Sequence, residues 1–323
     1  MMKEIGGYIE LDQYHLPMLH EKAIALNCGR NCLAYLILTK KIEKLVIPYF
    51  LCDSVKKLCE REHVKVRYYH IDQSFMPENV EIQEDEWLYI VNYYGQYTCE
   101  QICSLKKQYD RIIVDNAQAY FCDPIENIDT LYTCRKFFGV ADGAFLYTDK
   151  AIETELEIDE SFERMHFILG RFERTASEFY GEYAANNHMF ANEPIKQMSR
   201  LTKNLLHAVD YDHIKSQRTA NFECYAERLC NINSLELHTA EGAFAYPLLI
   251  EDGARVRKKL QAMKLYIPTL WPNVAAETPK DSLEYHYSND ILPLPCDQRY
   301  GEDEIDYIVS QIKNMIDRGD IRE

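Results

Sequence analysis

The sequence predicts an α/β protein that is built on a mostly parallel β-sheet. In the first half of the chain, short apolar runs alternate with helical stretches, and strands that alternate with helices pair in parallel through helical crossovers. From about residue 151 the chain becomes acidic and helix-rich, and it then ends in a smaller α+β unit. We therefore predict a large α/β domain at residues 1–190 and a smaller C-terminal α+β domain at residues 191–323.

The expected elements of the first half follow one another without long gaps. A turn at Asn27 leads into an apolar helical stretch, and the compact apolar run KLVIPYF behind it reads as a buried strand. The same alternation then repeats to residue 148. It predicts helices at 28–41, 53–63 and 98–109 and strands at 44–50, 64–71, 86–95, 111–118, 128–134 and 143–148.

The second half is less regular. The stretch 152–187 has a helical pattern, and its acidic beginning, 152–163, reads as the solvated face of a helix. A helix-rich section continues to about residue 231. The small unit then combines an apolar segment at 242–250, a helix at 254–264, a strand at 265–272 and a final helix at 302–319.

Composition limits the partners and the compartment. The net charge of −16 argues against nucleic acid or an anionic membrane as a general partner. The N-terminus lacks the apolar core of a signal peptide, and no stretch approaches the roughly 20 apolar residues of a membrane span. The 11 cysteines are odd in number and include no CxxC pair, which fits a reducing compartment. We expect a cytoplasmic protein, and the ten histidines show no metal-ligand spacing.

Candidate functional residues lie where strands end, because ligands of open parallel sheets gather at the carboxyl ends of the strands. The turn before the first helix carries Gly29, Arg30 and Asn31, whose backbone N–H groups could hold a phosphate. Asp115 ends a buried strand, and Lys136 follows another. Taken singly, the turn is more simply a helix cap and the lysine a solvated charge. Together, a lysine amine, an acid and a phosphate cradle are the usual complement for pyridoxal 5′-phosphate (PLP).

Motifs along nearly the whole chain resemble the DegT/DnrJ/EryC1/StrS family of sugar aminotransferases, which belong to the fold type I PLP-dependent enzymes. NCGRNCLAYLI resembles the phosphate-loop helix of that family, and LVIPYF through YYHID resembles its Val-Pro turn and the strand that follows. VNYYGQ, IIVDNAQAY and RKFFGVADGAFLYT resemble its later turn, its Asp strand and its lysine segment. In the second half, LGRFER and ILPLPCDQRYGEDEIDYIVSQI resemble an Asn-Tyr-Arg element and the final Leu-Pro stretch and helix.

The resemblance assigns roles to individual residues. It implies that Lys136 bonds to the cofactor aldehyde and moves protons during catalysis, and that Asp115 holds the pyridine nitrogen. Trp271 lies near the substrate mouth in this scheme, Arg174 keeps a basic position and Tyr94 closes a strand end beside the site. The residues implied for cofactor binding are Gly29, Arg30, Asn31, Phe50, Asp115, Gln118, Thr133 and Lys136.

This chain also departs from the family pattern at several positions. Arg30 stands where the family has a threonine, and Cys52 stands where an aromatic usually stacks on the cofactor ring, which Phe50 or Tyr49 could replace. Phe172 and Glu173 stand where the neighbouring subunit normally contributes an Asn-Tyr pair. These changes bear on the grip on cofactor and substrate more than on the fold.

The resemblance implies an aminotransferase that uses a glutamate-type donor to aminate a keto group of a nucleotide-linked sugar, for surface polysaccharide or a glycosylated metabolite. It also implies a homodimer with the site at the subunit boundary. Two alternatives stay open: a pyridoxamine-phosphate-dependent dehydratase, and a non-enzymatic binding or regulatory protein on the same scaffold. The lysine at 136 counts against the dehydratase, in which that residue is typically replaced.

Overall fold

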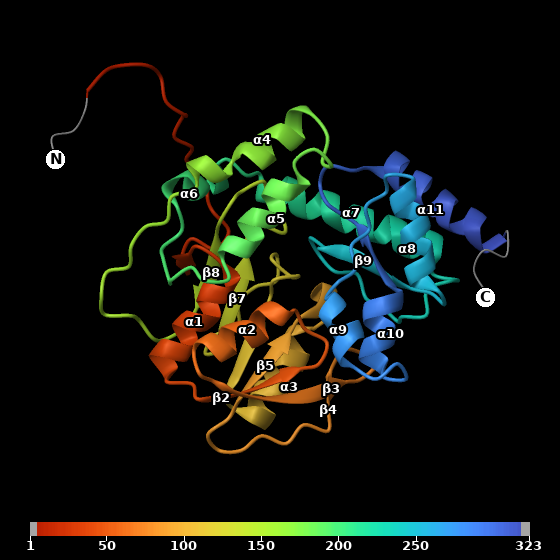
Figure 1. Ribbon diagram of the computed structural model, residues 1–323, viewed down its shortest axis with the longest axis horizontal. Helices are drawn as coiled ribbons and strands as arrows, with labels where there is room; N and C mark the ends of the chain where they lie inside the picture. The colour runs from red at the N-terminus through yellow and green to blue at the C-terminus, as the bar shows by residue number, and fades with distance from the viewer. Residues whose placement is uncertain (1–4, 318–323) are drawn as a thin grey trace.

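The computed structural model describes residues 5–317 and confirms the predicted fold class. Its main sheet has eight strands in the order β1-β8-β7-β6-β5-β2-β3-β4, and a separate two-stranded sheet pairs β10 with β9. The main sheet with α1, α2 and α3 forms one side of the molecule, and α7, α8, α11 and β9 gather on the other (Figure 1). Among the described residues, no helix is both long and apolar enough to cross a membrane.

The elements of the large unit match most of the predicted segments. Its strands are β1 (Ile24–Leu26), β2 (Lys44–Pro48), β3 (Lys65–Ile71), β4 (Pro77–Glu78), β5 (Trp87–Val91), β6 (Ile112–Asp115), β7 (Asp129–Thr133) and β8 (Ala144–Tyr147). Its helices are α1 (Gly29–Lys40), α2 (Asp53–Arg61), the 3-10 turn η1 (Tyr93–Gly95) and α3 (Cys99–Tyr109). Because Thr98 forms a complete capping box with Gln101, the start of α3 is fixed by sequence.

The centre of the sheet is parallel and its edges are antiparallel. Strands β2, β3, β5, β6 and β7 pair in parallel, whereas β8 runs against β7, β1 against β8 and β4 against β3. In the β6–β7 pair, Asp115 is opposite Leu131. The carboxyl ends of β6 and β7, and the residues that follow them, therefore lie at the same edge of the sheet.

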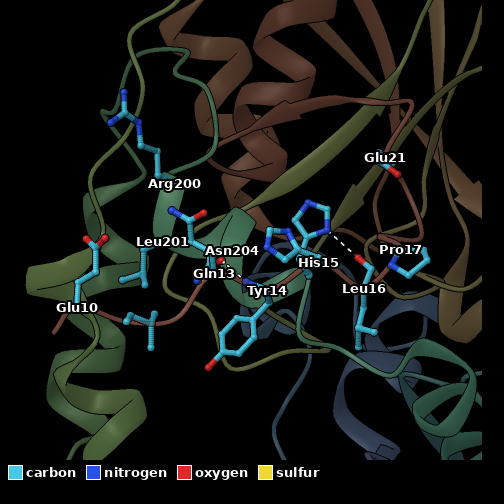
Figure 2. A pocket seen from close by; sticks show the side chains of 12 residues that line it. Glu10, Gln13, Tyr14, His15, Leu16, Pro17, Glu21, Arg200, Leu201 and Asn204 are labelled. Atoms are coloured by element: carbon cyan, nitrogen blue, oxygen red, sulfur yellow. Dashed lines mark hydrogen bonds between the residues drawn. The ribbon is translucent and has the colours of Figure 1, made fainter. Parts of the chain in front are cut away.

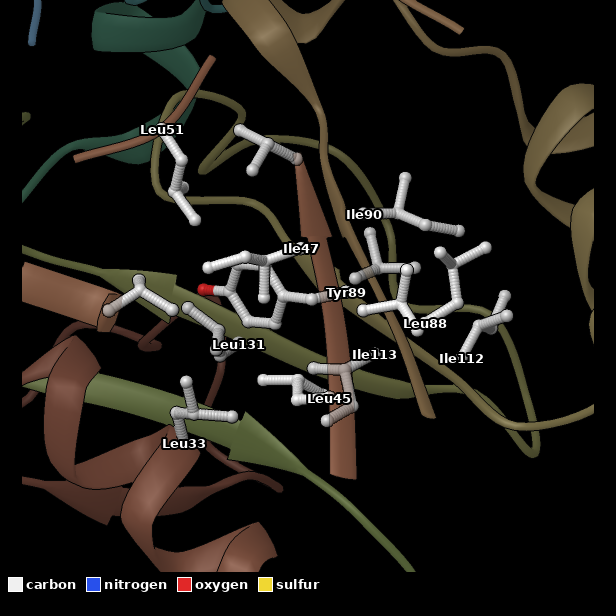
Figure 3. Packing of buried hydrophobic residues seen from close by; sticks show 14 of the residues in the cluster. Leu33, Leu45, Ile47, Leu51, Leu88, Tyr89, Ile90, Ile112, Ile113 and Leu131 are labelled. Atoms are coloured by element: carbon white, nitrogen blue, oxygen red, sulfur yellow. The ribbon is translucent and has the colours of Figure 1, made fainter. Parts of the chain in front are cut away.

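Continuous apolar runs place the central strands in the core. Ile112, Ile113 and Val114 are almost fully buried, as are Leu45, Val46 and Ile47 of β2. Figure 3 shows Leu45, Ile47 and Ile113 near the ring of Tyr89 of β5, in the cluster that also contains Leu33 of α1. Burial on both faces is what a parallel sheet needs, and it explains why these strands show apolar runs in place of an alternating pattern.

The second unit has its own core. Its elements are α7 (Tyr211–Leu229), β9 (Ala245–Leu249), α8 (Gly253–Ala262), α9 (Pro272–Glu277), α10 (Leu283–Asp290), β10 (Ile291–Pro295) and α11 (Glu302–Asp317). Phe222, Leu248 and Ile312 pack together there. Residues 318 and 319 of the predicted final helix lie outside the described residues. The domain boundary at residue 190 stays a prediction.

The prediction of a helix at 152–163 is wrong. This acidic stretch is irregular, and Ile158 forms an isolated bridge to Gln197. Asp159 turns its carboxylate to Arg164, 2.7 Å away, at the 3-10 turn η2 (Phe162–Arg164). Bonds to distant segments therefore replace helical ones here. Helices in this region begin later, as α4 (His166–Glu173), α5 (Tyr180–Met189) and α6 (Arg200–Leu206).

The prediction of a strand at 265–272 is also wrong. The segment is irregular, and Pro272 starts α9 at the position where proline is favoured in a helix. Pro268 has no N–H to give to a neighbouring strand. Ile267 is nevertheless buried, and its carbonyl accepts a hydrogen bond of 3.1 Å from Gln261 Nε2. The apolar residues of this segment therefore serve packing, and β9 finds its partner in β10 instead.

Candidate active site at the sheet edge

The N-terminus of α1 lies against the end of β7. A side chain at Gly29 would place its Cβ 3.9 Å from the Cβ of Thr133. The residue before the helix, Cys28, is extended, and its side chain makes no capping hydrogen bond within the part of the chain that the structure describes. The first turn also contains no acidic residue. The positive end of the helix therefore lies beside Thr133 with no acidic side chain in its first turn.

Two arginines add positive charge at this point. Arg30 donates a hydrogen bond of 3.2 Å to the carbonyl of Asn187, and Arg135 donates to the side-chain oxygen of the same asparagine. Both cations also act on the thiol of Cys28, where they oppose the rise in pKa that burial causes. Arg30, Arg135 and the start of α1 therefore form one electropositive cluster.

Arg135 is the most deeply placed cation of this cluster. Its guanidinium lies 5.0 Å from the centre of the Phe190 ring, and burial lowers its pKa. Arg164 shares that ring at 5.3 Å but pairs with Asp159. Among residues 5–317, no carboxylate forms an ion pair with Arg135. Its guanidinium contacts only neutral groups there, the amide of Asn187 and the ring of Phe190.

Asp115 ends β6 with a buried and well-bonded carboxylate. Its Oδ2 accepts a hydrogen bond of 2.6 Å from the hydroxyl of Tyr89, and its Oδ1 accepts one of 2.8 Å from the N–H of Ala117. Burial raises the pKa of Asp115, while the charge of Lys136 and these two hydrogen bonds oppose the rise. The charge of Lys136 therefore acts on the acid, whereas a shared site for the two residues stays a prediction.

Lys136 stands in the turn that follows β7. Its side chain is exposed, and its Nζ lies 5.4 Å from the centre of the Phe244 ring. The residues behind it, Phe137 and Phe138, are buried in an aromatic cluster with Tyr120. The two buried phenylalanines therefore hold the turn against the core, while the lysine that precedes them is exposed.

Gln118 has an unused donor. Its Oε1 accepts a hydrogen bond of 2.8 Å from the N–H of Tyr94, which fixes the orientation of the amide. Its Nε2 is buried and has no hydrogen-bond partner among the described residues. Because buried donors are rarely left unpaired in folded proteins, this one points to an acceptor that comes from a ligand or from water.

Other predicted residues are held in the protein core. Asn31 is buried and donates from its amide to Asn27 and Pro194, at 2.9 and 2.6 Å. Phe50 is also buried, with its ring 4.7 Å from that of Trp271 in an edge-to-face contact. As ligand contacts, the side chains of Asn31 and Phe50 stay predictions.

The predicted substrate residues are scattered. The side chain of Tyr94 is buried against Phe75, and its backbone has the unusual φ of 54°. Arg174 ends α4 in an exposed position and pairs with Glu178. Trp271 is partly buried at the start of α9. The structure therefore brings Gly29, Thr133, Asp115 and Lys136 to one edge. Tyr94 is linked to this site through the hydrogen bond of its N–H to Gln118, whereas Arg174 pairs with Glu178 on the surface.

Three residues around the site were missed by sequence reasoning or were given another role. Arg135 was passed over as an anion ligand, although it directly precedes Lys136. Tyr89 reads as an ordinary strand residue, and only the β5–β6 pairing shows that it reaches Asp115. Arg218 of α7 lies far away in sequence, and a lone arginine within a polar helix gave no signal.

A cavity of 940 Å³ lies away from this edge. It separates the segment around Tyr14 from α6, with His15, Arg200 and Asn204 in its wall (Figure 2). Asn204 and His207 bind the backbone of residues 12–16 across it. Within the described residues, no group of three or more His, Cys, Asp or Glu side chains could hold a metal ion.

The sequence matches no family model, and no curated protein sequence matches it significantly. Solved structures do share its fold. A DegT DnrJ EryC1 StrS aminotransferase from Brucella abortus is 14% identical, with a TM-score of 0.62 over 91% of this chain and 85% of that chain. A sugar aminotransferase from Micromonospora echinospora is 12% identical, with a TM-score of 0.61 over 91% of this chain and 87% of that chain.

The Streptococcus pneumoniae protein Spr1654, in its PMP-form, is 14% identical and has a TM-score of 0.65 over 93% of this chain and 88% of that chain. All three similarities extend through both the main sheet and the second unit, because each covers at least 91% of this chain. The chain therefore has the fold of the DegT/DnrJ/EryC1/StrS aminotransferases, which is the fold that its motifs resemble.

Proposed function

We propose that this chain is a PLP-dependent aminotransferase. One observation carries the proposal: the buried carboxylate that ends β6, Asp115, lies at the same sheet edge as the turn of Lys136 after β7, where Thr133 meets the start of α1. Proteins with this fold include sugar aminotransferases. The function also agrees with the resemblance of the motifs.

The residues present fit the phosphate end of PLP. The uncapped start of α1 and the hydroxyl of Thr133 offer hydrogen-bond donors, and Arg30 and Arg135 offer charge. A guanidinium can bind two phosphate oxygens at once. The absence of a carboxylate partner for Arg135, among the described residues, is consistent with an anionic ligand at this point.

The residues present also fit the ring of PLP. A buried carboxylate such as Asp115 is costly unless a cation or several donors face it, and the protonated pyridine nitrogen is such a cation. The unpaired Nε2 of Gln118 could donate to the phenolic oxygen of the ring. Asp115 and Gln118 are three residues apart, so one short segment would hold two sides of the same ring.

When bound, PLP supplies an electron sink for bond breaking at the carbon that carries the amino group. In our proposal, Lys136 would hold the cofactor through its Nζ, and the same amine would take up and return the proton of that carbon as a general base and acid. Asp115 would face the ring nitrogen. Tyr89 and the N–H of Ala117 hold its two oxygens in place.

For the substrate we propose a keto group on a nucleotide-linked sugar, with a glutamate-type amino donor. One protein of this fold, DesI, was solved in the presence of its TDP-sugar product. The product would serve surface polysaccharide or a glycosylated metabolite in the cytoplasm. Tyr94, Arg174 and Trp271 are kept as proposed substrate residues.

We further propose a homodimer. Helices α4 and α5 lie on the outside of the molecule (Figure 1) and expose large apolar side chains, among them Leu169, Phe172 and Tyr180. Tyr183 of α5 acts on Arg135, so the exposed helices lie next to the cationic cluster. A second copy covering α4 and α5 would complete the surroundings of the site.

A dehydratase and a non-enzymatic protein are the alternatives. Lys136 argues against the dehydratase, because that enzyme class typically has another residue at this position. The non-enzymatic reading was motivated by Arg30 and by Phe172-Glu173, and the electropositive cluster around Arg30 weakens the first of these motives.

The test is to trap the cofactor. Purified protein is mixed with PLP, reduced with borohydride and digested, and the modified peptide is located by mass spectrometry. We expect the phosphopyridoxyl group on Lys136 and none on Lys136→Ala, while Lys150→Ala, a change on the exposed surface, behaves as wild type. Labelled glutamate and a panel of keto-sugar nucleotides then identify the substrate. Absence of a modified lysine in the wild type would refute the proposal.

A further inference from the structure

Arg218 is a buried arginine of α7 that contacts the turn bearing Lys136. It is 1% exposed, and its NH2 group donates a hydrogen bond of 3.2 Å to the carbonyl of Phe137, the residue after the lysine. Its guanidinium also lies 4.7 Å from the centre of the Phe137 ring. One side chain of the second unit therefore holds both the backbone and the ring of this residue.

The same guanidinium fixes the other side of the lysine. Its NH1 group donates a hydrogen bond of 2.9 Å to the carbonyl of Ala243. The next residue, Phe244, carries the ring against which Nζ of Lys136 lies. Arg218 therefore links the carbonyl of Phe137, which follows Lys136, to the carbonyl of Ala243, which precedes Phe244.

Gln298 completes the arrangement. It accepts a hydrogen bond of 2.8 Å from Nε of Arg218 and donates one of 3.0 Å to the carbonyl of Phe137. The carbonyl of Phe137 is therefore held by two donors from two segments of the second unit. Phe137 is buried, so its carbonyl needs protein donors, and here both of them come from the second unit.

The charge of Arg218 has no carboxylate bonded to it within the described part of the chain. Asp297 is near enough to act on it, but both oxygens of that carboxylate bind Arg299, at 2.6 and 2.9 Å. Burial lowers the pKa of Arg218 to about 10. A buried cation costs free energy, and packing alone would be better served by an apolar side chain.

We propose that Arg218 and Gln298 are positioning residues that fix the Lys136 turn and its Phe244 neighbour in the geometry needed for the lysine to bond to the cofactor aldehyde. The proposal rests on the proposed function. It assigns the second unit a direct part in placing the reacting amine. A guanidinium suits this task because its planar fork reaches three acceptors in fixed directions, which an ammonium cannot do.

The test compares Gln298→Ala and Arg218→Lys with Arg257→Lys. Arg257 is a matched control, because it is also a buried arginine of the second unit and donates to a backbone carbonyl, that of Ile291, at 2.7 Å. Hydrogen–deuterium exchange of residues 134–141 is measured without cofactor. We expect exchange on the order of tenfold faster in the two clamp variants and unchanged in Arg257→Lys.

A second measurement separates positioning from general structure. Pyridoxamine phosphate has no aldehyde and cannot bond to a lysine, so the ratio of PLP to pyridoxamine phosphate affinity reports the covalent step. We expect this ratio to fall by roughly tenfold in Gln298→Ala, which loses the hydrogen bonds to Arg218 and to the carbonyl of Phe137, and further in Arg218→Lys. A structural role would lower both affinities together.

Unchanged exchange and an unchanged ratio in both clamp variants would overturn the proposal, as would an equal change in Arg257→Lys. If Arg218→Lys does not fold, Gln298→Ala decides alone. If the wild type forms no bond to PLP, the proposed function fails, whereas the exchange of residues 134–141 still decides whether the clamp holds the turn.

Discussion

The hydroxyl of Tyr89 donates a hydrogen bond of 2.6 Å to Oδ2 of Asp115, across the parallel pair of β5 and β6. Both side chains are buried, so the acid is held by a neutral donor where no solvent can compete. The tyrosine leaves the charge of Asp115 uncancelled. That charge is available to a cationic ring, and four predictions follow from this arrangement and from those around it.

Asp115→Asn separates stability from function. Burial raises the pKa of Asp115, so the folded state binds this proton more tightly than the unfolded chain, and stability falls as pH rises from the unfolded value of about 3.9 through the folded one. We expect the cofactor-free variant to be more stable than wild type in urea at pH 7, with a difference that shrinks toward pH 4. PLP affinity should fall roughly 10- to 100-fold. A less stable variant would contradict the pKa direction.

Arg135→Met tests the anion cluster. If Arg135 binds the phosphate, the variant should lose roughly 10- to 100-fold in affinity for PLP, while its affinity for pyridoxal, which lacks the phosphate, changes little. Arg164→Met serves as the control, because Arg164 lies on the same Phe190 ring but already pairs with Asp159. Equal losses for PLP and pyridoxal in Arg135→Met would show that the arginine only supports the structure.

From the buried ring of His20 we predict that the stability of the folded state decreases in acid. The ring donates from Nε2 to the carbonyl of Tyr120 at 2.9 Å, and burial lowers its pKa from 6.5 to about 4. As the pH falls from 6.5 to 4, the unfolded chain binds this proton before the folded chain does. The free energy of unfolding should therefore decrease by up to about 1.4 kcal/mol for each pH unit of acidification. His20→Gln can keep the donor but does not titrate. Urea unfolding across this range should show a shallower pH dependence for the variant, and equal slopes would refute the prediction.

We predict that the position of Gly143, beside the lysine turn, does not tolerate a side chain. Its φ is 112°, and an added Cβ would lie 3.0 Å from Cγ2 of Thr202. We expect Gly143→Ala to lower the free energy of unfolding by about 1–3 kcal/mol, because the backbone conformation and the contact both oppose a side chain. Gly181→Ala, with open space around its position, should change stability little. Chemical denaturation of both variants checks the difference.

The sequence predicted the central sheet because its strands are buried on both faces and read as apolar runs. Asp115 and Lys136 stood out because a buried acid and a lysine at strand ends are chemically unusual. The strand at 265–272 was wrong because its apolar residues pack without pairing, and periodicity does not distinguish the two cases. The helix at 152–163 was wrong because contacts with distant residues, such as Ile158 with Gln197, outweighed local propensity.

The supporting residues of the site were beyond reach for a different reason. Tyr89, Arg218 and Gln298 act through contacts that join segments 26 to 161 residues apart. No local pattern encodes such distances. Motifs therefore indicated candidate reacting groups, whereas the side chains bonded to them or to their turn became visible only in three dimensions.

The uncapped start of α1 also bears on how long the folded chain survives. The positive end of the helix and the charges of Arg30 and Arg135 meet there without an acidic residue in the first turn, and a bound anion would offset this repulsion. By mass action, a ligand at 100 times its dissociation constant adds about 2.7 kcal/mol to the stability of the folded state. If the proposed cofactor is that ligand, its supply would affect the survival of the folded chain as well as its activity.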